Sequence, residues 1–185
     1  MNANDFVLSL IDAFDDHVEG GSFLQGRAYF VSVLAGIDSD VGLANHYNGS
    51  YSFSVDSSVA RLKSVGLLNQ SETEPPVTSS GFGIKRQEYR LTNEGVKAAA
   101  AVKQRKDYGN IAHACQAIKA GNPDQLTLSI AAKTYFTLKK RGQEMSPSNI
   151  VREAQKYNST IDKTTLDAVV RFFAEFKVGQ RSNPN

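Results

Sequence analysis

Apolar residues recur every three or four positions in the first part of the chain, the spacing that places side chains on one face of a helix. A first helix is predicted to end at Gly20-Gly21. Its inward face comprises Val7, Leu10, Ile11, Phe14 and Val18. A second helix is predicted to begin near Ser22 as an N-cap and to stop at Gly36. Its inward residues are Leu24, Ala28, Val31, Leu34 and Ala35.

A third helix is predicted after the polar loop "IDSDVGLANHYNGSYS". Its apolar stripe comprises Val55, Val59, Leu62 and Gly66. Placing residues at 100° intervals leaves the opposite face for Ser57, Ala60, Arg61 and Ser64. One face of this helix is therefore expected to pack, and the other is expected to be free.

The period changes after the third helix. "GLLNQ" is a short apolar run, and "SETEPPVTSSGFG" is rich in turn formers. In "IKRQEYRL", one set of alternating positions holds Ile84, Arg86, Glu88 and Arg90, and the other holds Lys85, Gln87, Tyr89 and Leu91. This pattern predicts a two-stranded hairpin with a long tip. Thr92 then caps a helix of strong helix formers, "LTNEGVKAAAAVKQR". Three helices followed by a hairpin predict a mainly α protein with a small β-hairpin, arranged as a winged helix-turn-helix.

The remaining third of the chain is predicted to be helical. One stripe consists of Ile111, Ala114, Cys115 and Ile118. A second helix is expected after an Asn122 cap and Pro123, and a third after Ser146-Pro147. A last amphipathic helix is marked by Leu166, Val169, Val170, Phe173 and Phe176. We expect a winged-helix domain over 1–106, a C-terminal helical unit over 107–178 that could be a second helix-turn-helix, and a disordered tail over 179–185.

The formal net charge of +2 is small, but the charge is unevenly distributed. Residues 1–60 hold one base and eight acids (net −7), whereas 61–110 carry +4 and 111–185 carry +5. The basic remainder could meet nucleic acid, or these charges could be ordinary solvated helix surface. A single cysteine excludes disulfides within the chain, and neither a signal peptide nor a spanning segment is recognisable. A cytoplasmic protein is expected.

A longer motif runs from Gly49 to Leu67. It has the form G-x-Y-S-x-x-h-x-x-x-h-x-x-L-x-x-x-G-L, where h is apolar, and "YRLTNEG" follows it. This motif resembles that of the uncharacterised winged-helix proteins called YwgA-like, and more distantly that of winged-helix regulators and antitoxin-type proteins. The likeness extends into "LSIAAKTYFTLKKRGQEMSPSNIVREAQKY". The resemblance implies a winged-helix fold and says little about function. Ser50 stands where the family usually has Pro, and Gly26 stands where Lys is common, so Arg27 is the second helix's only base.

Catalysis lacks a candidate in this sequence. His17, His46 and His113 are scattered over an acidic helix, a loop and an expected core stripe, and no nucleophile, phosphate-loop or zinc motif is present. Asp15-Asp16 with Glu19 could hold a cation, but such carboxylates are usually solvated. No enzyme, metal site or cofactor is expected.

Two binding functions remain open. For double-stranded DNA, the candidate residues lie on the third helix and the hairpin: Ser54, Ser57, Ser58, Arg61, Ser64, Lys85, Arg86 and Arg90. The low charge of the central reading face argues against DNA. The alternative is a protein-interaction module, antitoxin- or adaptor-like, because winged helices also bind proteins. A two-fold homodimer would double the charge and match a palindromic site. The sequence favours a DNA-binding transcriptional regulator.

Overall fold

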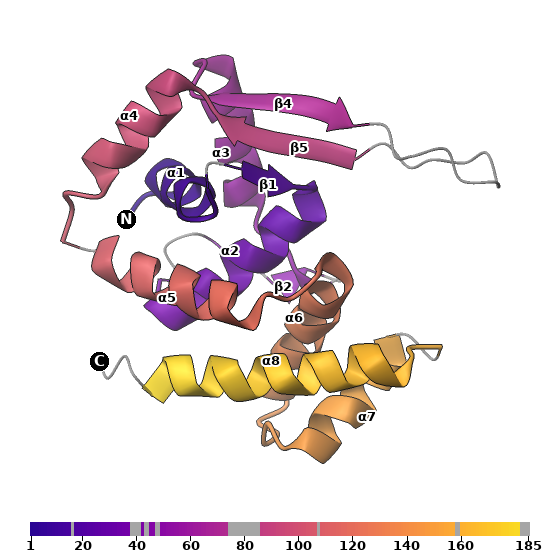
Figure 1. Ribbon diagram of the computed structural model, residues 1–185. Helices are drawn as coiled ribbons and strands as arrows, with labels where there is room; N and C mark the ends of the chain where they lie inside the picture. Colours follow the sequence, from indigo (N-terminus) through magenta and orange to yellow (C-terminus); the bar gives the residue numbers. More distant parts are fainter. Residues whose placement is uncertain are drawn as a thin grey trace.

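The structure is a computed structural model that describes residues 1–15, 17–37, 42, 45–46, 49–73, 86–106, 108–157 and 160–181. This part of the chain is mainly helical and carries a small three-stranded antiparallel sheet (Figure 1), so the predicted helix-rich composition is confirmed. The elements, in chain order, are α1 (Ala3–Ala13), β1 (His17–Glu19), α2 (Gly21–Ala35), β2 (Asn45–His46), β3 (Gly49–Ser50), α3 (Phe53–Ser64), β4 (Leu68–Thr73), β5 (Arg86–Leu91), α4 (Asn93–Val102), α5 (Tyr108–Gly121), α6 (Gln125–Lys140), α7 (Pro147–Tyr157) and α8 (Lys163–Arg181).

The predicted pairing of two strands after the third helix is confirmed. β4 and β5 run antiparallel, from Leu68 opposite Leu91 to Thr73 opposite Arg86. Tyr89 and Leu91 are buried, as the alternation along β5 predicts for one face of a strand. We call these two strands the β4–β5 ribbon; it lies at one edge of the molecule, with β1 beside β5 (Figure 1).

The sheet contains a third strand that the sequence did not predict. β1 pairs with β5, with Val18 opposite Tyr89, whereas the helical spacing had placed Val18 on the first helix. α1 instead ends at Ala13, and Asp15 turns the chain with a φ of +63°. A strand of three residues is too short to show alternation, and its one buried apolar residue also fits a helical period.

Several predicted helix ends shift by a few residues. α2 begins after Gly20 rather than at a Ser22 cap, and Gly36 closes it with the expected positive φ of 70°. α6 is capped by Asp124, whose Oδ1 accepts the Thr127 N–H at 2.7 Å, and not by Asn122. α8 continues to Arg181, so residues 179–181 of the predicted tail are helical. Residues 182–185 lie outside the described part of the chain.

α2 lies at the centre of the molecule and is buried on most of its circumference. Its neighbours include α1, α5 and α6. Tyr29 and Phe30 of α2 meet Tyr135 of α6, and the ring of Phe30 lies 4.9 Å from that of Phe172 on α8. The buried apolar residues form one continuous core on both sides of the predicted boundary at 106/107. The two predicted units therefore share their hydrophobic core.

Gly26 has a packing role in this arrangement. A Cβ at this position would lie 3.0 Å from Cδ2 of Leu128 on α6. Leu128 would have to shift by a few tenths of an ångström to admit even a methyl group here, so Gly26 permits the close approach of α2 and α6.

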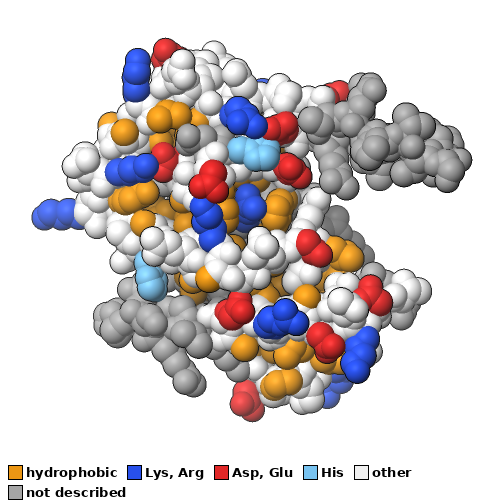
Figure 2. Space-filling view, in the orientation of Figure 1, with side chains coloured by type: hydrophobic (Ala, Val, Ile, Leu, Met, Phe, Trp, Pro, Cys, Tyr) orange, Lys and Arg blue, Asp and Glu red, His pale blue; other side chains and the backbone are white. Residues whose placement is uncertain are grey.

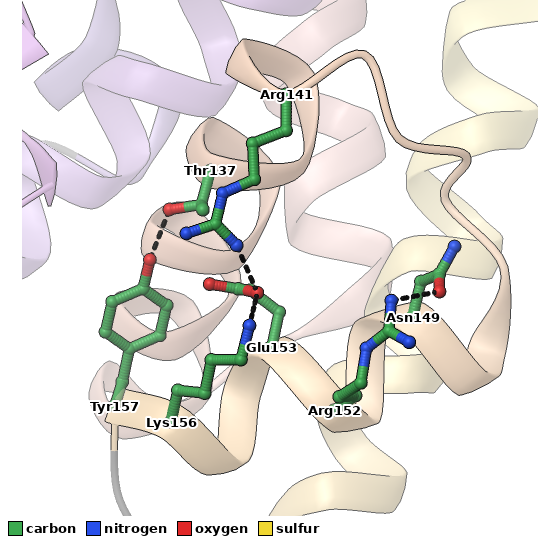
Figure 3. Close-up of polar contacts among 7 residues, drawn as sticks. All are labelled: Thr137, Arg141, Asn149, Arg152, Glu153, Lys156 and Tyr157. Carbon is green, nitrogen blue, oxygen red and sulfur yellow. Dashed lines mark hydrogen bonds and ion pairs between the residues drawn. The ribbon is translucent and has the colours of Figure 1, made fainter.

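A polar cluster holds α7 against α6 (Figure 3). The buried carboxylate of Glu153 accepts bonds from Arg141 at 3.0 Å and from Lys156 at 2.7 Å. Beside this carboxylate, the hydroxyl groups of Tyr157 and Thr137 are hydrogen-bonded to each other. The bond from Arg141, at the end of α6, joins the two helices, whereas the bond from Lys156 lies within α7.

Candidate nucleic-acid interface

The third helix is held firmly at its N-terminus. Ser52 Oγ accepts the Val55 N–H at 3.1 Å, which caps α3. The side chain of Gln25, on α2, accepts the Ser52 N–H at 2.9 Å and donates to the Ser52 carbonyl at 3.2 Å. A buried amide that replaces two backbone partners fixes the start of the helix to α2. The orientation of α3 is therefore set by the core.

The predicted packing face of α3 is largely confirmed. Val55, Val59 and Leu62 are all buried. Gly66 is exposed and lies beyond the helix with a φ of +74°, so it belongs to the turn into β4 and not to the apolar stripe. Its carbonyl accepts the Thr92 hydroxyl at 2.8 Å, which ties this turn to the start of α4.

The free face of α3 carries small side chains with a basic residue on each flank. Ser57, Ala60 and Ser64 are exposed, and Arg61 and Lys63 are exposed beside them. Ser54 is half-buried. Ser58, a predicted DNA contact, is buried and lies about 40° from Leu62 around the helix. Ser58 therefore belongs to the packing side of α3 and is not part of the free face.

The β4–β5 ribbon separates the predicted contacts. Lys63 donates to Gln70 of β4, and Gln70 lies opposite the buried Tyr89. Because side chains alternate along a strand, α3 is on the Tyr89 side and Arg90 points to the other side. Arg90 is therefore not on the face that α3 presents, whereas the sequence had placed it with Arg61 among the candidate DNA contacts.

Arg90 also has its charge compensated. Its Nη2 atom lies 2.9 Å from Glu88, which is also 2.9 Å from Nε2 of His17 on β1. The bond from Arg90, followed by the charges of His17 and Arg90, lowers the pKa of the Glu88 carboxyl despite partial burial. The backbone of Arg86 lies in β5 opposite Thr73. Lys85 and the predicted hairpin tip from 74 onward lie outside the described residues.

A polar pocket beside the start of α3 was not predicted. Its volume is about 720 Å³, and its lining includes Gln25, Tyr51, Asp56 and two residues of α6, Ser129 and Lys133. Burial, followed by the neighbouring Asp56, raises the pKa of Tyr51. Lys133 thus adds a basic side chain near the start of α3. Sequence spacing could not associate it with α3, because the two helices are distant in the chain.

A second unpredicted feature borders the other flank of α3. Arg61 lines a largely apolar groove of about 480 Å³ between α1, α3 and α4, and Leu8 and Val102 are among the other residues that line it. Val65, at the end of α3, is 61% exposed beside it. Phe53, at the start of α3, is 75% exposed. The surface around α3 therefore combines basic, hydroxyl and apolar groups.

The remaining candidate residues are dispersed. Cys115 is buried, as its stripe predicted, and burial raises the pKa of its thiol to about 12. His113 is exposed, which corrects its placement in the core stripe. Asp15 is bound by Lys119, and Asp16 lies outside the described residues. In the described ranges, no three His, Cys, Asp or Glu side chains gather as metal ligands.

No protein-family model matches the chain, and no curated protein is significantly similar to it. Within the described residues, no helix is both long and apolar enough to cross a bilayer.

Proposed function

We propose that this protein binds double-stranded DNA through α3 and acts as a transcriptional regulator. The observation that supports this best is the free face of α3, where Ser57 and Ser64 lie between Arg61 and Lys63. Hydroxyl and basic side chains on one helix face are suited to bind phosphates and base edges in a major groove. A non-enzymatic role and membership of the YwgA-like winged-helix family are parts of the same proposal.

The order of elements supports a winged-helix arrangement. Helix α1, strand β1, helix α2, the short β2–β3 pair, helix α3 and the β4–β5 ribbon follow one another, and β5 lies between β1 and β4 in the sheet. In such a unit the third helix enters the groove, and the ribbon contacts the backbone beside it. In this structure β4 lies beside α3 (Figure 1).

The basic set of the proposed interface differs from the set that the sequence suggested. Arg61 and Lys63 flank the reading face, and Lys133 of α6 lies near its start. Arg90 is excluded, because it faces the opposite side of the sheet and is paired with Glu88. Asp56 is exposed on α3, and its carboxylate disfavours phosphate nearby.

A protein partner is the second candidate function. Phe53 is 75% exposed at the start of α3, and Val65 is 61% exposed at its end. Large exposed apolar side chains on one element favour a protein interface, which includes a second copy of this chain. This alternative and DNA binding place different residues of α3 in contact with the partner.

Fluorescence anisotropy with a random-sequence duplex over a salt series tests the proposal. Arg61→Ala is expected to weaken binding by about 1–3 kcal/mol, because a groove contact is lost. Lys63→Ala is expected to lower the log-log salt slope by about one. Arg90→Ala is the matched control, since it removes an exposed arginine from the other face, and it should leave binding unchanged.

Absence of duplex binding by the parent protein at low salt would retire the DNA proposal. Equal losses in Arg61→Ala and Arg90→Ala would contradict the assignment of α3 as the contacting helix. If the parent protein instead self-associates in sedimentation, and Phe53→Ser abolishes this without changing the melting temperature, the protein-binding function replaces it.

A further inference from the structure

The guanidinium of Arg27, on α2, lies between two aromatic rings. Its Cζ atom is 4.0 Å from the ring centroid of Phe14 and 3.9 Å from that of Phe23. Phe14 ends α1, and Phe23 lies one turn before Arg27 on α2. Ring faces at this distance attract the cation but offer its N–H groups no strong hydrogen-bond acceptor.

The charge of Arg27 is not compensated by a bonded acid. Among the described residues, no hydrogen bond or ion pair satisfies its guanidinium, although Asp15 and Glu19 are close enough to act on it electrostatically. Desolvation is the main influence and lowers its pKa to about 10, so the group remains charged at neutral pH. A partly buried cation without an acceptor gains strongly from an incoming anion.

Arg27 lines a pocket of about 380 Å³, and residues of β1 and α5 also line this pocket. Lys119 of α5 supplies a second cation there. Its Nζ atom bonds both oxygens of Asp15, at 2.9 and 3.0 Å, and the carbonyl of Ala13 at 3.1 Å. These bonds fix the ammonium at the pocket edge. Figure 2 shows basic, acidic and histidine side chains gathered over hydrophobic ones in this region of the surface.

We propose that this pocket binds a small molecule through a single carboxylate or phosphate group, held by the edge of the Arg27 guanidinium with Lys119 beside it. Either group presents two oxygens at the spacing of a guanidinium fork. The pocket volume lies within the range of about 300–1,000 Å³ that is usual for small-molecule sites.

The charges around the pocket limit which anions can bind there. Glu19 and Asp15 also line it, so two carboxylates oppose the two cations. A polyanion such as nucleic acid or a nucleoside triphosphate would be repelled, whereas one oxyanion group placed at Arg27 would not. The pocket is also formed by different elements from the α3 surface. The inference therefore stands independently of DNA binding.

The test is an NMR titration of the full chain, labelled with ¹⁵N, using inorganic phosphate and acetate as separate probes at constant ionic strength. Saturable shifts at the amides of Asp15, Glu19 and Lys119 are expected, with millimolar dissociation constants. Arg27→Gln should weaken binding by at least about tenfold. Arg152→Gln, which alters an exposed arginine on α7, is the matched control and should bind like the parent.

Arg27→Lys serves as a second variant in case the glutamine protein does not fold. Lysine keeps the positive charge and the aliphatic part of the side chain but lacks the planar guanidinium that can donate two parallel hydrogen bonds, so binding should again weaken. Saturation by phosphate alone or by acetate alone supports the site and identifies the group it prefers. No saturable shift with either probe overturns the proposal. Shifts that persist unchanged in both Arg27 variants mean an adventitious ion only and overturn it equally.

Discussion

At the scale of single residues, space around the backbone decides which positions tolerate change. Gly95 lies in the first turn of α4, where an added Cβ would be 2.0 Å from the carbonyl oxygen of Leu67. Gly109, in α5, has nothing within 4 Å of the same position. Both glycines are helical, so helix propensity acts in the same direction on each.

Gly95→Ala is therefore expected to destabilise the protein by about 1–3 kcal/mol or more, because the turn between α3 and β4 must move. Gly109→Ala should stabilise it by about 0.5–1 kcal/mol through helix propensity alone. Urea denaturation of the two variants measures the difference. Similar stabilities for both would show that the contact between Gly95 and Leu67 is absent in solution.

Cys115 gives a prediction about reactivity. Its buried thiol has a pKa of about 12, raised mainly by desolvation. Since the thiolate is the reactive form, only a fraction on the order of 10⁻⁴ is ionised at pH 8, and raising the pH toward 12 should increase it. Labelling by a disulfide reagent at pH 8 should be slow in the native protein and fast in urea. Rapid native labelling would mean that α5 opens or that the thiol is exposed.

At the scale of elements, α3 is positioned by one apolar stripe and by its cap. Leu62 is 3% exposed in the middle of that stripe, and Lys63 follows it on the exposed flank. Leu62→Ala should cost about 2–5 kcal/mol, because burial is lost and a cavity remains. Lys63→Ala should change stability by less than about 0.5 kcal/mol. Thermal denaturation followed by circular dichroism checks both, and a Leu62→Ala protein as stable as the parent would contradict the packing of α3.

The polar cluster around Glu153, between α6 and α7, gives a second prediction at the scale of elements. Glu153 is buried and bonded to Arg141 and Lys156, both of which are about half exposed. Water screens the two cations, so Glu153→Gln should cost about 1–3 kcal/mol, which is less than a fully buried ion pair would cost. Arg152→Gln on the same helix is the control. If both variants unfold at the same urea concentration, Glu153 does not stabilise the hairpin.

At the scale of the whole molecule, the shared core predicts cooperative folding. Tyr29 and Phe30 on α2 pack against Tyr135 and Phe172 from the last helices. Helical and aromatic signals should therefore disappear in one transition. The fragment 1–106 exposes this face of α2 and should not unfold cooperatively by itself. A fragment that melts as sharply as the full chain would show that the N-terminal part is an independent domain.

Much of the local structure could be predicted from spacing. The apolar stripes of α2, α3 and α5, the Thr92 cap and the alternation of side chains along β5 all follow from short-range pattern. β1 could not be predicted, because Val18 fits two periods and only pairing with β5 selects the strand. In the candidate interface, Arg61 is exposed, as predicted. Ser58 and Arg90 were assigned to the same surface as Arg61, but Ser58 is buried and Arg90 lies on the other face of the sheet.

The sequence by itself determined most of the helical segments and the apolar residues on each of them, because these depend on neighbours within a few residues. Tertiary structure decided the rest. It placed Arg90 behind the sheet, brought Lys133 near α3, and enclosed Arg27 between Phe14 and Phe23. Each of these outcomes depends on how distant elements pack, and a periodic pattern carries no information about which faces will meet.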